Sequence, residues 1–150
     1  MNHKSKEFLE SCNQCEIICK KCIEICKKLT DTFEKNNELE CAEQVDKCLV
    51  ICDQTIESCK RFADHFTQHI KECKKSECIE LYDHAIEATN RTQEACTNCM
   101  IQLEQDQTQP PYTYGEEFKE WMADVVDACK NCIFRCHECV KYCQEARKNI

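Results

Sequence analysis

Cysteines recur at helical spacing near both ends of this 150-residue chain. Five of them near the amino end follow one another at intervals of three, four, three and four residues, and five near the carboxyl end do the same. Residues at these intervals lie on one face of an α-helix, so each set forms a stripe of thiols. Two thiols on neighbouring turns can bind one soft ion, and Cu(I) is the biological ion that prefers such ligands. The two sets are Cys12, Cys15, Cys19, Cys22, Cys26 and Cys129, Cys132, Cys136, Cys139, Cys143.

The other cysteines lie between these two sets, and all 18 are candidate metal ligands. Buried thiolates need neutralisation, because charge in a low-dielectric core is costly. One Cu(I) per bridging thiolate cancels the charge, whereas tetrahedral zinc with four thiolates keeps a charge of −2 and needs ligands from several directions. Linear stripes therefore favour Cu(I). The remaining candidates are Cys41, Cys48, Cys52, Cys59, Cys73, Cys78, Cys96 and Cys99.

Two other interpretations of the cysteines are packing and disulfide bonding. A single residue such as Cys41 or Cys73 can be a small buried hydrophobe. For a whole set at core positions this is a poor explanation, since leucine would bury more area without the risk of oxidation. Disulfides within a stripe are disfavoured because its Cβ atoms are about 5–6 Å apart, although bridges between helices remain open.

The composition predicts an all-α, soluble chain. It contains one glycine and two prolines, and its charged residues alternate in sign, as on the solvent-exposed faces of helices. The net charge of −8, without a basic cluster, argues against nucleic acid and anionic membranes as partners. There is no apolar run of signal-peptide or membrane-span length, so we expect a cytoplasmic location, where thiols stay reduced.

We predict one domain, an antiparallel up-down-up-down four-helix bundle with cysteines lining the core. The first turn is expected at Lys35–Asn37, and the proline-containing segment 106–115 is the clearest break. The second turn is placed at Asp64–Gln68 in preference to Lys74–Ser76. The helices are then expected at about 5–34, 38–64, 68–105 and 116–148.

An antiparallel turn at Asn36 fixes which thiols of the first two helices lie level. Residues whose numbers sum to about 72 share a height, because both helices rise ~1.5 Å per residue. The third helix has few thiols and forms the poorest wall, so we expect the thiols of the first helix to face those of the second and fourth. The level pairs are Cys26 with Cys48, Cys22 with Cys52 and Cys15 with Cys59; the thiol-poor positions are Tyr82, Ala85, Thr89 and Thr92.

Histidines and methionines are weaker candidates. His65 and His69 are spaced to receive metal at the bundle end near Cys12, Cys59, Cys73 and Cys143, although a solvated pair at the turn is the preferred interpretation. His84 and His137 are expected not to bind metal. No phosphate loop, dinucleotide turn or di-iron motif is present, and we expect no enzyme. The residues expected to plug the opposite end are Leu29, Phe33, Met100, Trp121 and Met122.

The chain resembles the bacterial copper storage proteins, a family of cysteine-rich four-helix bundles. The resemblance rests on the stripes of the first and last helices and on the spacing Cys41-x6-Cys48-x3-Cys52. It covers about three quarters of the chain. It implies binding of many Cu(I) ions inside the bundle, a homo-oligomer such as a tetramer, and a cytosolic form without a signal peptide.

These observations favour a cytosolic Cu(I) store or buffer, supplied by a copper chaperone or a small chelator. Two other classes remain open. One is a protein with discrete four-thiolate sites for zinc or cadmium, or with an iron–sulfur cluster. The other is a thiol redox or structural protein with disulfides between helices.

Overall fold

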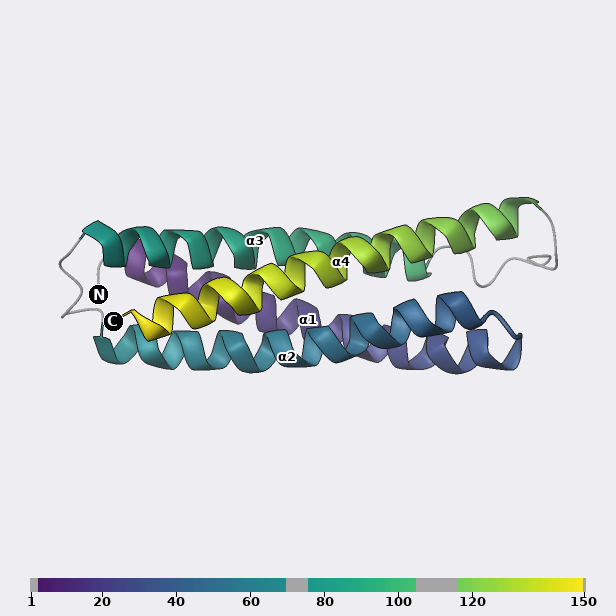
Figure 1. The fold of residues 1–150 in the computed structure, drawn as a ribbon, viewed down its shortest axis with the longest axis horizontal. Helices are drawn as coiled ribbons and strands as arrows, with labels where there is room; N and C mark the ends of the chain where they lie inside the picture. The colour runs from purple at the N-terminus through teal and green to yellow at the C-terminus, as the bar shows by residue number, and fades with distance from the viewer. Residues whose placement is uncertain (1–2, 70–75, 105–115, 150) are drawn as a thin grey trace.

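The computed structural model describes residues 3–69, 76–104 and 116–149, and this part of the chain forms four α-helices. They pack together as an all-α four-helix bundle, which confirms the predicted fold class, and successive helices run in opposite directions (Figure 1). No helix of the described residues is long and apolar enough to cross a membrane. The helices are α1 (His3–Lys35), α2 (Leu39–His69), α3 (Ser76–Glu104) and α4 (Glu116–Lys148).

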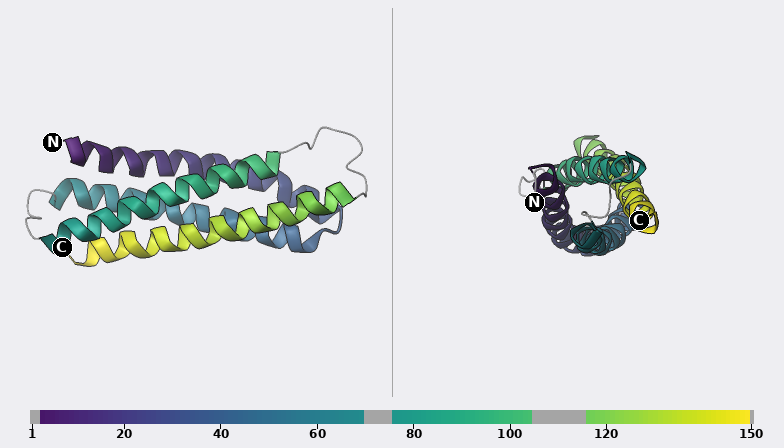
Figure 2. Two further views of the ribbon diagram at one scale, coloured as in Figure 1. Left: turned by 90° about the horizontal axis from the view of Figure 1, so that it is seen from above. Right: turned by 90° about the vertical axis from the view of Figure 1, so that its left-hand side faces the viewer.

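The lateral order of the helices differs from their order in the chain. Helix α1 packs mainly against α2 and α3, and α4 packs against the same two helices. Figure 2 shows this in its end view, where α1 lies diagonally opposite α4 and α2 lies diagonally opposite α3. The thiols of α1 and α4 therefore face one another across the centre of the bundle, with neither helix beside the other.

The turn between α1 and α2 lies where the sequence predicts it. Asn37 adopts a left-handed conformation with φ of 59°, which asparagine tolerates better than most residues. The backbone N–H of Glu38 donates to the carbonyl of Phe33 at 2.8 Å, and that of Asn37 donates to Glu34 at 3.2 Å. This pair of bonds is the Schellman motif, which satisfies the last carbonyls of α1 and reverses the chain.

The predicted second turn at Asp64–Gln68 is wrong, because α2 continues through these residues to His69. Phe62 and Phe66 extend the buried stripe of α2 by another turn and are both almost fully buried. Without glycine or proline in this stretch, burial of the two rings favours continuation of the helix. Helix α3 begins at Ser76, later than predicted. Residues 70–75 and the predicted loop 106–115 lie outside the described residues.

The predicted stripes form the core. The inward positions of the four helices are buried and make one cluster. We call the buried cysteines of this cluster other than Cys41 the thiol column. Each helix closes the column with an aliphatic residue one turn beyond its last cysteine at one end, and we call these the aliphatic layer. Its members are Leu29, Val45, Leu103 and Val125, all buried.

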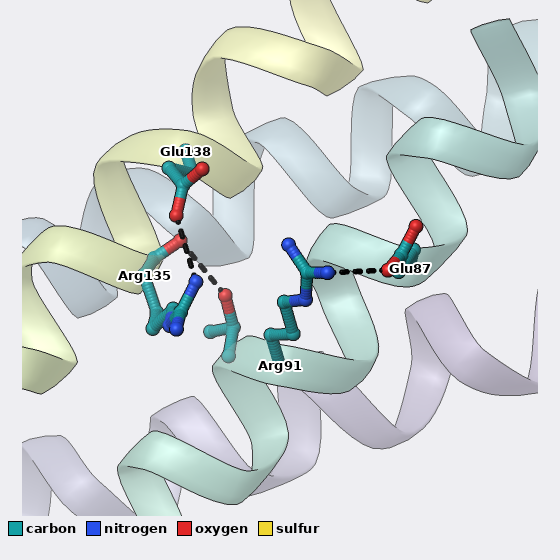
Figure 3. Close-up of polar contacts among 5 residues, drawn as sticks. Glu87, Arg91, Arg135 and Glu138 are labelled. Carbon is teal, nitrogen blue, oxygen red and sulfur yellow. Dashed lines mark hydrogen bonds and ion pairs between the residues drawn. The ribbon is translucent and has the colours of Figure 1, made fainter.

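The thiol-poor wall of α3 holds the bundle together by hydrogen bonds. The hydroxyl groups of Thr89 and of Ser11 on α1 are 2.8 Å apart, and the Thr92 hydroxyl donates to the Arg135 carbonyl on α4 at 3.0 Å. Both threonines are fully buried. Outside them, Arg91 pairs with Glu87 and Arg135 with Glu138 (Figure 3), so these charges lie along the outer helix faces as predicted. Thr89 and Thr92 therefore link α3 by hydrogen bonds to its two neighbouring helices, α1 and α4.

Candidate metal centre

The core contains sixteen described cysteines, and all of them are buried and free of disulfide bonds. Sulfurs from different helices approach closely: the Sγ atoms of Cys96 and Cys132 are 3.2 Å apart, and those of Cys99 and Cys129 are 3.7 Å apart. The Sγ atoms of Cys52 and Cys96 are 3.9 Å apart. Thiols at these distances from several helices can converge on a single ion.

Three groups of four cysteines have their sulfurs within 4.8 Å of one another. Every group takes one cysteine from each of the four helices, so an ion bound there would cross-link the whole bundle. The groups overlap, since Cys52 and Cys96 belong to the first two and Cys22 and Cys132 to the last two. They are Cys19/Cys52/Cys96/Cys136, Cys22/Cys52/Cys96/Cys132 and Cys22/Cys48/Cys99/Cys132.

A fourth group continues the column toward the end of α2. Cys15, Cys59 and Cys139 have their sulfurs within the same 4.8 Å limit and come from α1, α2 and α4. Helix α3 contributes none, because Thr89 and Thr92 occupy its buried positions in this part of the wall. The predicted low thiol density beside α3 is therefore confirmed.

The structure also brings together the thiols of α1 and α2 that the first turn predicts to lie at equal height. Cys22 with Cys52 and Cys15 with Cys59 share sulfur groups. Cys26 and Cys48 are close enough for a side-chain hydrogen bond to perturb the pKa of both thiols. Cys73 lies outside the described residues, and so does the side chain of Cys78, which leaves their predicted ligand roles as predictions.

An aromatic cap, which the sequence analysis did not predict, closes the column near Cys12, Cys59 and Cys143. It consists of four buried rings from α1, α2 and α3: Phe8, Phe62, Phe66 and Tyr82. The ring centroids of Phe66 lie 4.9 Å from Tyr82 and 5.3 Å from Phe8, and those of Phe62 and Tyr82 are 5.6 Å apart. Such contacts stabilise a packed cluster. The sequence feature that could have predicted the cap is the replacement of cysteine by aromatic residues at the ends of three stripes.

The histidines lie apart from the sulfur groups. His65 and His69 have ring centroids 4.4 Å apart and are half-buried. Burial, followed by the influence of His69 and Arg147, lowers the pKa of His65. His84 and His137 are exposed, as expected for residues that do not bind the core metal. No metal-capable group among the described residues contains a histidine.

The residues predicted to plug the opposite end do pack there. The rings of Phe33 and Trp121 are 5.6 Å apart, and the Trp121 indole N–H donates to the Gln102 carbonyl at 2.8 Å. Leu29 is buried, while Met100 and Met122 are half-buried against the core. The thiol column therefore lies between apolar side chains at both ends.

Burial raises the pKa of Cys12, at one end of the column, and of Cys41, which lies outside the column. At Cys12, burial and then the neighbouring thiols Cys59 and Cys139 raise the pKa above its ordinary value of 9.0. At Cys41, burial followed by the carboxylates of Glu38 and Glu40 raises the pKa to about 11. A metal ion that binds these sulfurs must therefore displace protons, so binding is coupled to proton release.

We expect the reduced, metal-free protein to lose stability between pH 8 and pH 10. Above pH 9 the unfolded chain loses thiol protons, while buried Cys12 keeps its own. Each such thiol lowers the free energy of unfolding by at most about 1.4 kcal/mol per pH unit, a slope that is approached above pH 9. Anaerobic thermal unfolding followed by circular dichroism measures the effect. A midpoint that stays constant or rises between pH 8 and pH 10 would contradict it.

Comparisons with known proteins identify no relative: no family model matches the chain, and neither the curated proteins nor the solved structures contain a significant match.

Proposed function

We propose that this protein stores or buffers Cu(I) in the cytosol, holding many ions in its thiol column as a chain of thiolate-bridged copper. The observation that carries the proposal is the overlap of the sulfur groups. Cys22, Cys52, Cys96 and Cys132 each belong to two groups, so neighbouring ions would share them as ligands. Sharing of thiolates between ions suits Cu(I), which accepts two or three soft ligands.

The charge balance supports the same ion. Each thiol that binds Cu(I) gives up its proton to solvent, and no oxidation or reduction is involved. With one Cu(I) per bridging thiolate, the filled core carries no net charge. This matters because the sulfurs of the column are almost completely buried, where unbalanced charge is strongly unfavourable.

The rest of the molecule fits a container better than a catalyst. The sulfur groups lie in the core, and the described helices bring no histidine or carboxylate into them. The resemblance to the copper storage proteins stays an expectation from the cysteine spacing. A cytosolic location and the absence of enzymatic activity are parts of the same proposal.

Titration of the reduced protein with Cu(I) under anaerobic conditions, against a chromophoric chelator, tests the proposal. We expect tight binding of on the order of one Cu(I) per cysteine, since each bridging thiolate neutralises one ion. Proton release should rise in parallel with bound copper. Saturation after one or two equivalents would refute storage.

Zinc or cadmium is the second candidate, favoured by the spacing of two of the groups. Cys19/Cys52/Cys96/Cys136 and Cys22/Cys48/Cys99/Cys132 have no residue in common, so each can supply four thiolates to one ion. Eight thiolates around two divalent ions would leave four negative charges in the core, which is the reason to prefer Cu(I). Metal analysis of the purified protein tests this candidate. Two equivalents of bound zinc, together with no uptake of copper, would favour it.

A further inference from the structure

A surface cavity reaches the one buried cysteine that lies outside the thiol column. The cavity lies between the starts of α2 and α4, is lined by Cys41, and has a volume of about 370 Å³. Met122 lines the same cavity, and the Cys41 Sγ lies 3.8 Å from the Met122 carbonyl oxygen. A thiol and a thioether side chain thus border one opening, and both are soft ligands.

The charges around this cavity are mixed, with an excess of carboxylates. Glu38, Glu40 and Asp127 line it, against Lys119 and Lys130. The excess gives a weakly negative opening, which favours the approach of a cation or of a positively charged donor surface.

Two helical turns separate the cavity residues Cys41 and Met122 from the nearest thiols of the column on the same helices. Cys48 follows Cys41 by seven residues, and Cys129 follows Met122 by the same interval. Seven residues are two helical turns, about 10.5 Å, and return to the same helix face. Only the aliphatic layer lies between, and on these two helices its members are Val45 and Val125.

Among the described residues, the opposite end of the column is closed by the aromatic cap. The aromatic cap there consists of four rings in mutual contact, so displacing one ring disturbs the packing of the others. His65 and His69 lie on α2 at that end, and neither belongs to a sulfur group. The two ends therefore differ in how readily an ion can pass.

We propose that Cu(I) enters the thiol column from the Cys41 cavity, is bound first by Cys41 and Met122, and passes from there to Cys48 and Cys129. The step is a ligand exchange: Cu(I) leaves its donor ligand, Cys41 releases its proton to solvent, and the copper stays in the same oxidation state. This inference rests on the proposed function, because it requires Cu(I) as the ion.

The initial rate of Cu(I) transfer from a chromophoric chelator to the full-length reduced protein tests whether Cu(I) enters at the Cys41 cavity. The rate is measured where it rises linearly with protein concentration, so that uptake by the protein limits it. We expect C41S to slow this rate ~10-fold or more, with final capacity reduced by no more than about one equivalent. M122L, which keeps the volume and removes the thioether, should slow it in the same direction. M100L is the matched control for M122L, because it removes a half-buried thioether that does not line the cavity.

The outcomes separate this inference from the proposed function. Slow uptake by C41S and M122L, with wild-type rates for M100L and for H65A/H69A, supports entry at the Cys41 cavity. Wild-type rates for C41S and M122L, or slowing by H65A/H69A alone, overturn it while storage stands. A wild-type protein that takes up no Cu(I) overturns both. The helical circular dichroism signal identifies any variant that fails to fold, and M122L then decides the result.

Discussion

Loading the reduced protein with Cu(I) is expected to raise its midpoint of thermal unfolding by about 20 °C or more. Each four-sulfur group draws one ligand from every helix, so Cu(I) ions that share these thiolates together oppose separation of the four helices. A ligand at 100 times its dissociation constant contributes about 2.7 kcal/mol per site, and several sites together contribute on the order of 10 kcal/mol. For a chain of this length, each kcal/mol moves the midpoint by roughly 2–4 °C.

The measurement is anaerobic thermal unfolding followed by circular dichroism, with and without Cu(I). The metal-free protein should unfold at a modest temperature, since cysteine buries less apolar area than the leucine usual at such core positions. A loaded midpoint equal to the metal-free one would show that the ions do not bind within the core. Titration to partial occupancy gives a second check, because the midpoint should rise with each equivalent.

Replacing Cys22 and Cys132 with alanine is expected to remove roughly four equivalents of Cu(I), against about two for replacing Cys12 and Cys41. Both double variants lose two buried thiols. Cys22 and Cys132 each belong to two sulfur groups, whereas Cys12 and Cys41 belong to none. When a thiolate bridges two ions, its loss deprives both of a ligand. Loss of Cys22 and Cys132 should therefore lower the copper capacity by more than the number of sulfurs removed.

Copper capacity by anaerobic titration and elemental analysis measures this difference. The C22A/C132A protein should also show a smaller rise in unfolding midpoint on loading than C12A/C41A. Equal losses of capacity in the two variants would mean that the sulfurs bind ions independently, without bridging. A loss confined to a single divalent ion in C22A/C132A would favour the zinc alternative, in which Cys22 and Cys132 serve one site.

Closure of both ends of the column limits the oxidation of its thiols. The aromatic cap and the aliphatic layer exclude solvent from the sulfurs between them, which are almost completely buried. Oxidation of cysteine follows thiolate character and exposure, and here the exposure is low. Cys41, beside the surface cavity, is the described thiol that an external donor reaches first under the proposed mechanism.

Much of the fold and of the site could be predicted from the spacing of residues along the chain. Intervals of three and four determine which side chains share a helix face, whatever that face later packs against. The turn at Asn37 and the level pairing of Cys22 with Cys52 follow from one tight reversal and a common rise per residue. These are local properties, so the sequence was sufficient for them.

The tertiary structure decided which helices are neighbours and where α2 ends, which the spacing of residues leaves open. The stripes can be buried with α4 beside α1 or opposite it, and only packing places it opposite, in the arrangement where three of the sulfur groups draw from all four helices. The continuation of α2 through Asp64–Gln68 depends on burial of Phe66 against Phe8 and Tyr82. The aromatic cap joins rings from α1, α2 and α3 that are distant in the chain. By itself the sequence determined the thiol-lined faces; packing determined which thiols meet and which side chains close the column at each end.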